Sequence, residues 1–286
     1  MPRLSRLALI LAAALVLAGV VSAQNDPSWT APFAPFRVAG NLYYVGTRGV
    51  SSFLFVTPAG NILLDTGVEE AVPLVVANIE KLGFKTGDIK ILLASHAHFD
   101  HVGGHAAMQQ RTSATVMALG DDATALSSGV DGSALGGPGW KPVKVGRVLR
   151  DGDIVTLGGV TLTAHLTPGH TKGCTTWTTT VQQDGKTYRV VLIGGTSINA
   201  GVTLTNNTRH PRIIEDYART FTVLRDFSPD IFLAQHPNMF RMEDKVKRRL
   251  AGEANVFVDP QGYRAFVEAG EKAYQTQLAR ERGTSR

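Results

Sequence analysis

The chain has one cysteine, no apolar run long enough to span a membrane and only a small excess of positive charge. The single cysteine, Cys174, excludes a disulfide within the chain, so stability must come from a packed core. The formal net charge of +5 over 286 residues is too small to indicate a nucleic-acid-binding protein. A hydrophobic content of 43% and a charged content of 19% are those of an ordinary globular protein.

The first residues differ in kind from the rest of the chain. Two arginines precede an uninterrupted apolar stretch over residues 7–21, and the small residues Ser22 and Ala23 then offer a cleavage site. This pattern is typical of a secretory signal peptide, whereas a membrane-spanning helix needs about 20 apolar residues. We therefore expect a signal peptide at residues 1–23 and a mature domain at residues 24–286.

Removal of the signal peptide sets the expected location and charge. Cleavage after Ala23 removes Arg3 and Arg6 and lowers the net charge to +3. A lipid anchor would need a cysteine at the cleavage point, which Cys174 cannot supply. We expect a periplasmic or secreted monomer with no membrane attachment after cleavage and no nucleic-acid partner. The densest basic run, residues 245–249, is interpreted as the solvated face of a helix.

Strand-like and helix-like segments alternate along the mature chain in two blocks. The strand-like runs are rich in Val, Leu, Tyr and Phe and are interrupted by Gly and Pro. In the first block, strands are predicted at 36–45, 52–56, 61–64, 90–94 and 115–117, and helices at 69–82, from 104 and at 121–127. In the second block, strands are predicted at 144–149, 154–157, 160–166, 175–181, 188–193 and 231–234, and helices at 213–226, from 242 and from 262.

This order of segments predicts an α/β fold. Two strand-rich blocks that each finish in strand–helix units indicate two β-sheets packed face to face, with helices on the outer faces. No linker separates the two blocks, so we expect one domain. Residues 129–142 are rich in glycine and proline and are predicted to form a surface loop that borders the active site.

The strongest local signal follows a predicted buried strand and reads Ser95-His96-Ala97-His98-Phe99-Asp100-His101. A hydrophobic core could not absorb three imidazoles and a carboxylate within six positions. His96 and His98 point to the same side of an extended chain, because side chains alternate, so both can bind one metal ion. The following turn would carry Asp100 and His101 toward a second ion. Nitrogen and oxygen ligands without thiolate suit zinc.

Two further histidines lie at the ends of predicted strands. His170 follows the turn at Pro168 and Gly169, and His236 precedes Pro237. Ligands gather at strand ends in open sheets, so both histidines can converge with the first cluster. The sequence therefore predicts two sites, with His96, His98 and His170 for one zinc ion and Asp100, His101 and His236 for the other.

The order His-x-His-x-Asp-His, then a Gly-His-Thr turn, then a final His after a strand, resembles the metallo-β-lactamase superfamily. The resemblance extends over most of the mature chain. It implies a four-layer αβ/βα sandwich with the metal ions at one edge. It also implies that Asp65, in the run Leu63-Leu64-Asp65-Thr66-Gly67, supports the ligand histidines without binding metal itself.

Residues 191–198 narrow the resemblance. Many hydrolases of the superfamily place a metal-bridging Asp after the strand that follows the third histidine, and the first β-lactamase subclasses place a metal-binding Cys nearby. Residues 191–198 contain neither. The chain therefore resembles the third subclass of class B β-lactamases, as do its stretches at 29–36 and 168–177. Cys174, four residues past His170, is then expected to be a buried packing residue and not a ligand.

The resemblance implies zinc-dependent opening of the β-lactam ring, with antibiotic resistance as the role. Two zinc ions would share a hydroxide that attacks the carbonyl carbon, and Asp100 would orient the water. No covalent acyl-enzyme is expected. Thr196 and Ser197 are approximate matches to serines that hold the substrate carboxylate in the third subclass.

Two other functions stay open at this point. One is an exported lactonase or thioesterase of the same superfamily, and the other is a zinc-binding protein without catalytic activity. The remaining histidines are interpreted as bystanders. His105 is predicted to be a surface or capping residue, His165 to lie along a strand, and His210 to lie in a loop.

Overall fold

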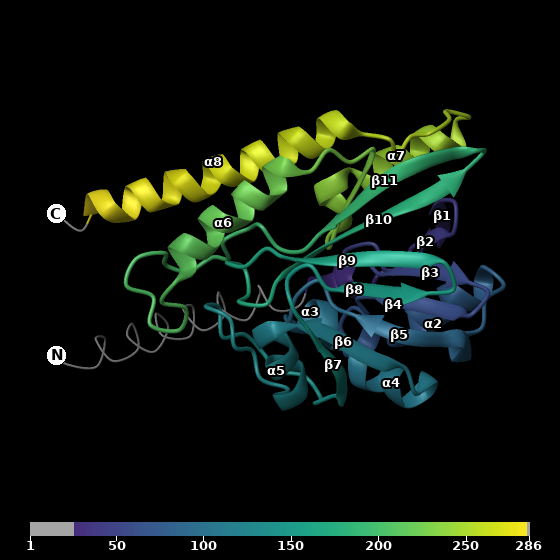
Figure 1. Ribbon diagram of the computed structural model, residues 1–286, viewed down its shortest axis with the longest axis horizontal. Coiled ribbons are helices and arrows are strands. Elements are labelled where there is room, and N and C mark those ends of the chain that lie inside the picture. The colour runs from purple at the N-terminus through teal and green to yellow at the C-terminus, as the bar shows by residue number, and fades with distance from the viewer. Residues whose placement is uncertain (1–25, 285–286) are drawn as a thin grey trace, which may run out of the picture.

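The computed structural model describes residues 26–284, so the predicted signal peptide lies outside the described residues. The described strands form two sheets that lie face to face, with helices on both outer sides (Figure 1). In Figure 1 most of the first sheet, coloured blue to teal, lies below the longest strands of the second sheet. The predicted four-layer α/β sandwich is confirmed.

The first sheet has seven strands in sequence order. Its strands are β1 (Phe36–Ala39), β2 (Leu42–Tyr44), β3 (Phe53–Thr57), β4 (Gly60–Leu64), β5 (Ile89–Leu93), β6 (Thr115–Leu119) and β7 (Val145–Leu149). The first four strands pair antiparallel, and the pairs from β4 to β7 are parallel. Parallel pairing requires crossover connections, which explains the helices between these strands.

The second sheet has five strands in the order β12-β11-β10-β9-β8. Its strands are β8 (Ile154–Leu157), β9 (Val160–Leu166), β10 (Thr175–Gln183), β11 (Lys186–Ile193) and β12 (Ile231–Ala234). Only the pair β11 and β12 is parallel among these five, and a long helix makes the crossover between them.

The helices cover the outer faces of the two sheets (Figure 1). The α-helices are α2 (Val72–Lys81), α3 (Phe99–Val102), α4 (His105–Thr112), α5 (Gly120–Ser128), α6 (Ile213–Asp226), α7 (Met242–Leu250) and α8 (Pro260–Thr284). The 3-10 helices are η1 (Pro27–Thr30), η2 (Glu69–Ala71), η3 (Thr86–Asp88) and η4 (Pro237–Phe240). Over residues 26–284, no helix combines the length and apolar character that crossing a membrane requires.

Alternation along the strands divides the core into two layers. In β3, Phe53 and Phe55 belong to the cluster between the sheets, whereas Leu54 belongs to the cluster beneath α2 and α4. β5 repeats the pattern, because Leu93 faces the second sheet and Leu92 faces the helices. A strand segment buried on both sides must be apolar at successive positions, as Phe53 to Phe55 and Ile91 to Leu93 are.

The predicted single strand at residues 36–45 is wrong in one respect. It divides into β1 and β2, which pair antiparallel with a register shift between Arg37 and Ala39. The turn passes through Gly40, whose φ of +50° lies in the left-handed region. A Cβ there would overlap the carbonyl group of Gln182, so the turn requires glycine.

The interpretation of residues 245–249 as a solvated face is also wrong at both ends of the run. Lys245 is 1% exposed, and its Nζ lies 2.9 Å from a carboxylate oxygen of Asp259, just before α8. Arg249 lies over the ring of Phe257 and donates hydrogen bonds to two carbonyl groups of β1. Long basic side chains can be buried where a carboxylate or carbonyl group accepts their hydrogen bonds. The spacing of charged residues in the sequence does not reveal such partners.

Candidate functional site

The predicted ligands lie at the ends of strands, along one edge of the sandwich. The segment from His96 to His101 follows β5 and runs into α3. His170 lies in the loop after β9, and His236 immediately precedes η4 after β12. Strand ends from both sheets therefore meet at this edge, in agreement with the general rule for open α/β sheets.

The structure brings together all six residues that the sequence singled out. His96, His98 and His170 form one group, and Asp100, His101 and His236 form another. Within each group the candidate ligand atoms all lie within 4.8 Å of one another. The two groups are adjacent, because the ring centroids of His96 and His101 are 4.2 Å apart. The arrangement is one centre with room for two ions.

Backbone carbonyl groups orient two of the imidazoles. The Nδ1 atom of His170 donates to the carbonyl oxygen of Ser197 at 2.6 Å, and Nδ1 of His236 donates to that of Gly49 at 2.8 Å. A carbonyl oxygen can only accept, so the proton of each ring is fixed on Nδ1. The Nε2 atom of each ring is therefore left with a free lone pair, which is how second partners prepare histidine ligands.

Hydroxyl groups orient two others. Ser95 Oγ lies 3.2 Å from Nδ1 of His96, and Ser133 Oγ lies 3.0 Å from Nε2 of His98. These contacts leave Nε2 of His96 and Nδ1 of His98 facing the centre. Nε2 of His96 is buried without a hydrogen-bond partner, whereas the ring nitrogens of His101 face the carboxylates of Asp100 and Asp65. Buried polar atoms without partners are rare in proteins and indicate a missing ligand.

Asp65 occupies the supporting position that the sequence predicted. Its Oδ1 accepts the backbone N–H of Ser95 at 2.7 Å, and its Oδ2 accepts the Ser95 hydroxyl at 2.6 Å. Nδ1 of His101 lies 3.5 Å from the same Oδ2. Asp65 itself has a φ of 59°. This unusual backbone conformation turns the carboxylate under the ligand loop.

Burial keeps the first group of imidazoles uncharged at neutral pH. It lowers the pKa of His98 to about 4 and the pKa of His170 to about 3. Burial and the neighbouring imidazoles also hold the pKa of His96 well below its usual range. Neutral imidazoles are the form that binds a metal ion.

In the second group His101 favours its charged form, whereas burial lowers the pKa of His236. Burial alone would raise the pKa of Asp100, but His101 and its neighbours hold it well below its usual range. Burial alone would lower the pKa of His101, but Asp100 and Asp65 raise it to about 10. Nε2 of His101 lies 3.1 Å from Asp100 Oδ2. A zinc ion, with two positive charges, would be stabilised by the same carboxylates that favour the charged form of His101. The residues present therefore fit zinc in both groups.

The centre opens into a pocket of about 410 Å³. Its apolar walls include Trp29 and Phe99, whose rings meet edge to face, together with Leu135 and Pro138. It is also lined by Ser197, Asn199, Ala200 and Gln235. Among residues 26–284, no lysine or arginine lines this pocket. Ser197 and Asn199 are therefore neutral donors that a negatively charged substrate group could meet here.

The loop at residues 129–142 forms one wall of this pocket, as the sequence predicted. Asp131 shapes it by accepting the backbone N–H groups of Ser133 at 2.7 Å and Gly137 at 2.6 Å. Arg209 holds the loop in place with two hydrogen bonds. Its Nε donates to the carbonyl of Ser133, and its Nη2 donates to that of Asp131. Arg209 belongs to the segment between β11 and α6, which also contributes residues to the pocket lining.

The two predicted substrate residues lie differently. Ser197 lines the pocket, whereas Thr196 is 6% exposed and is absent from the lining. Their role in binding a carboxylate stays a prediction. Asn199, which the sequence did not single out, lines the pocket with an amide that can donate.

Cys174 lies outside both groups of candidate ligands. Its Sγ is buried and accepts the backbone N–H of Gly195 at 2.8 Å. Burial raises the pKa of this thiol to about 12, so the metal-binding thiolate form is disfavoured.

The other histidines belong to neither group of candidate ligands, and one interpretation is corrected. His105 is fully buried, not on the surface, and its Nδ1 lies 2.8 Å from Thr66 Oγ1. Its helix packs against β5, the strand that leads into the ligand loop, which periodicity could not reveal. His165 contacts the hydroxyl of Thr178 at 2.7 Å, and His210 lies 2.7 Å from a carboxylate oxygen of Asp216.

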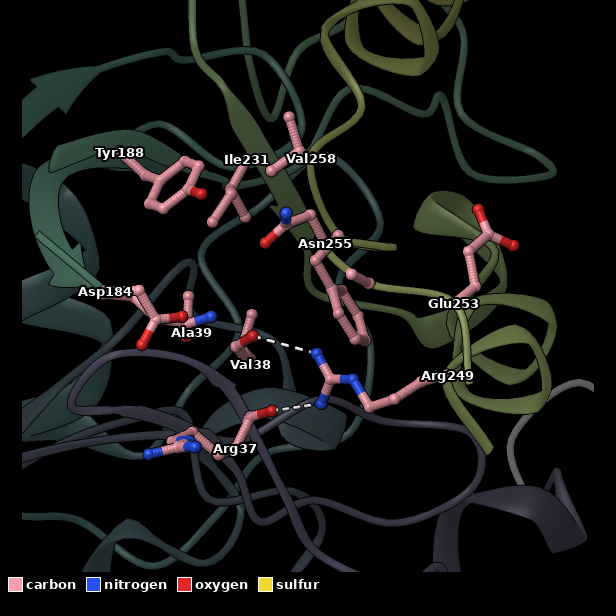
Figure 2. Close-up of a pocket in the computed structure, with 13 residues that line it drawn as sticks. Arg37, Val38, Ala39, Asp184, Tyr188, Ile231, Arg249, Glu253, Asn255 and Val258 are labelled. Atoms are coloured by element: carbon pink, nitrogen blue, oxygen red, sulfur yellow. Dashed lines mark hydrogen bonds between the residues drawn. The ribbon is translucent and has the colours of Figure 1, made fainter. Parts of the chain in front are cut away.

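A second cavity of about 410 Å³ lies at the opposite end of the strands (Figure 2). Ile231, which begins β12, lines it, whereas His236 follows the other end of that strand. Figure 2 shows the Arg249 guanidinium reaching across the cavity floor to the carbonyl groups of Arg37 and Val38. None of the candidate metal ligands lines this cavity. Arg249 joins α7 to β1, so its role is structural.

Comparison with known proteins agrees with this geometry. A family model described as the metallo-beta-lactamase superfamily matches residues 45–236. The native FEZ-1 metallo-beta-lactamase from Legionella gormanii is 44% identical with a TM-score of 0.86, and the alignment covers 88% of this chain and 98% of that one. BJP-1, a subclass B3 metallo-beta-lactamase of Bradyrhizobium japonicum, is 35% identical with a TM-score of 0.85, covering 91% of this chain and 98% of that one.

Two further similarities bear on the number of metal ions and on the choice of substrate. LRA-12, a class B3 di-zinc metallo-beta-lactamase from an Alaskan soil metagenome, is 34% identical with a TM-score of 0.84, covering 89% of this chain and 97% of that one. A hydroxyacylglutathione hydrolase of Rhodopseudomonas palustris is 33% identical over 119 residues, which are 42% of this chain. The match spans only 39% of the length of that hydrolase.

Proposed function

Since the chain belongs to the metallo-β-lactamase superfamily, we propose that it is a β-lactamase that opens the β-lactam ring of antibiotics by zinc-dependent hydrolysis. The observation that carries the proposal is the pair of adjacent ligand groups in one pocket, each ready to hold an ion. Similarity over nearly the whole length of several β-lactamases supports the choice of substrate.

We propose two zinc ions as the cofactor. His96, His98 and His170 would hold one ion, and the remaining group of Asp100, His101 and His236 would hold the other. When bound, zinc supplies a hydroxide at neutral pH and a Lewis acid for the lactam carbonyl. The unpartnered Nε2 of His96 and the charged pair of Asp100 and His101 support this assignment.

Asp100 has a second task in the proposed mechanism. Its carboxylate is ionised at neutral pH, and its Oδ2 atom faces His101 at 3.1 Å and His236 at 3.4 Å. The carboxylate can therefore accept a hydrogen bond from the attacking water and orient it toward the carbonyl carbon. Binding of the substrate in the same pocket would bring its carbonyl carbon close to this water.

The pocket walls suit a bicyclic substrate with one carboxylate. Trp29, Phe99 and Leu135 offer apolar surface for the substituents of the rings. Ser197 and Asn199, which also line the pocket, are the neutral donors that can meet the carboxylate. The sequence pointed to Ser197, but Asn199 becomes a candidate only from its place in the pocket.

A thioester hydrolase is the second candidate, because the sequence matches a hydroxyacylglutathione hydrolase. The structure favours the lactamase at one position. Gly195 follows the strand β11, where many of those hydrolases carry a metal-bridging Asp, and a Cβ at Gly195 would overlap the ring of His170. No such carboxylate can be placed there while His170 keeps its position.

A hydrolysis panel with purified protein tests the proposal. We expect ring opening of nitrocefin and imipenem that is abolished by a chelator and restored by zinc. A lactone and a glutathione thioester are the matched alternatives. Hydrolysis of either one with no turnover of any β-lactam would replace the proposed function, and metal binding without any hydrolysis would indicate a zinc-binding protein.

We also propose that the protein acts after export, in the periplasm or outside the cell, where it would confer antibiotic resistance. The signal-like residues 1–23 support this location. The exported enzyme would then hydrolyse the β-lactam before the antibiotic reaches the cytoplasm. Expression in a sensitive host, with and without residues 1–23, tests it: protection should need the segment, and equal protection by both forms would contradict the proposal.

A further inference from the structure

We propose that Asp122 is a positioning residue that fixes the spacing between the loop carrying His96 and His98 and the loop carrying His170. Its carboxylate touches neither zinc ligand nor substrate pocket. The inference rests on the candidate metal site and not on the identity of the substrate.

The carboxylate bridges the two loops directly. Its Oδ2 accepts the backbone N–H of Ala97 at 2.8 Å and the hydroxyl of Thr171 at 2.7 Å. Its Oδ1 accepts the backbone N–H of Gly173 at 2.9 Å. Ala97 lies between His96 and His98 in the chain, and Thr171 follows His170. One side chain therefore holds both halves of the first ligand group.

The Asp122 carboxylate is buried, so water cannot easily replace its hydrogen-bond partners. Asp122 is 4% exposed and lies in the first turn of α5, where the helix dipole favours a negative charge. The second loop is pressed against this turn, because a Cβ at Gly173 would lie 2.6 Å from the backbone nitrogen of Asp122. Glycine is required there for the close approach.

Only a carboxylate satisfies all three donors. The three groups that face Asp122 are two backbone N–H groups and a hydroxyl, and an ionised carboxylate has acceptor capacity on both oxygens. Asparagine has one oxygen, and its amide would point two protons at the remaining donor. Buried donors left without an acceptor are costly, so the loops would move apart to find other partners.

A second contact between the loops would keep the protein folded if the hydrogen bonds of Asp122 were lost. The backbone N–H of Thr175, at the start of β10, donates to the carbonyl of Ser95 at 2.8 Å. This bond joins the two segments and does not involve Asp122. Loss of the Asp122 contacts should therefore loosen the ligand spacing and leave the fold in place.

The test is the loss of zinc from zinc-loaded protein to a chelator. We expect Asp122→Asn to weaken zinc binding at the group of His96, His98 and His170 by about 10–100-fold, the range that supporting partners of metal ligands contribute. The cobalt-substituted variant should show a changed visible spectrum, because the geometry of the ligands would differ. Asp121→Asn is the matched control, since it removes the same charge from an exposed neighbour.

A milder variant guards against a folding defect. Thr171→Val removes one of the three donors and keeps the carboxylate, so we expect it to weaken zinc binding several-fold, with an unchanged circular dichroism spectrum. Wild-type zinc affinity in Asp122→Asn, or in Thr171→Val if the first variant does not fold, would overturn the proposal. Equal weakening by Asp121→Asn would overturn it too. No β-lactam enters these measurements, so they stand apart from the test of the proposed function.

Discussion

At the scale of single residues, Asp100 separates metal binding from catalysis. Asp100→Asn removes the charge and the proton acceptor but leaves His96, His98 and His170 in place. We expect that variant to retain the zinc ion of the first group and to lose roughly 100-fold or more in kcat, the contribution typical of a general base. Steady-state kinetics and elemental analysis check both parts, and a wild-type rate would contradict the assignment.

Cys174 tests whether sulfur takes part in the site. Its buried Sγ accepts from Gly195, and burial raises the pKa of the thiol to about 12. Cys174→Ser should keep both zinc ions and most activity, with a stability loss of about 1 kcal/mol, typical of a small buried change. Zinc content and urea unfolding measure this. Loss of one zinc ion from a folded variant would show that the second group includes sulfur.

Residue types and spacing were enough to find all six candidate ligands, because no packed core tolerates such a cluster. The sequence could not show most of the side chains that hold these ligands in position. Asp122 and Ser133 act through atoms that meet only after β-strands far apart in the chain are folded together. His105 looked like a surface residue, because nothing local indicates that the start of α4 is buried.

At the scale of elements, the two loops that form the pocket walls depend on one arginine. Arg209, from the segment between β11 and α6, holds the loop at residues 129–142 through the carbonyl groups of Asp131 and Ser133. Arg209→Ala should free that loop and raise KM for β-lactams about tenfold, with a smaller change in kcat, since the metal ligands are untouched.

The control for this prediction is an arginine in the same segment. Arg212 is exposed and lies at the start of α6, so Arg212→Ala removes the same charge with no bond to the loop. Its KM should equal that of the wild type. A similar rise in KM for both variants, measured at several salt concentrations, would assign the effect to charge and not to the loop.

Elements were predicted well where apolar periodicity is strong and poorly where the turn or packing decides. The strand at β5 and the helix at α6 were placed almost to the residue. The break between β1 and β2 depends on the contact of Gly40 with a distant strand, and the burial of Lys245 depends on Asp259. Neither partner can be identified from local sequence.

At the scale of the whole molecule, export remains a prediction from the sequence. Mass spectrometry of protein made in an exporting host should find Gln24 as the first residue, because cleavage after Ala23 removes the predicted signal peptide. The control is the same gene expressed with residues 1–23 deleted. An intact Met1 in the active, exported fraction would refute the cleavage site.

The fold explains how one edge of the molecule comes to hold two ions. β5, β9 and β12 belong to two sheets, and each ends at the same edge with a ligand loop. The contact between the sheets is a continuous apolar core that includes Phe55 and Trp177. A rigid core of this kind fixes the ligand loops relative to one another, so the centre is prepared before any ion binds.

Zinc titration of the metal-free protein, followed by nitrocefin hydrolysis and by elemental analysis at each point, tests the central claim most directly. The six ligands in two adjacent groups predict two zinc ions per chain at saturation, with full activity only when both groups are filled. Full activity at one tightly bound zinc ion per chain, or two bound ions with no hydrolysis of any β-lactam, would contradict the account.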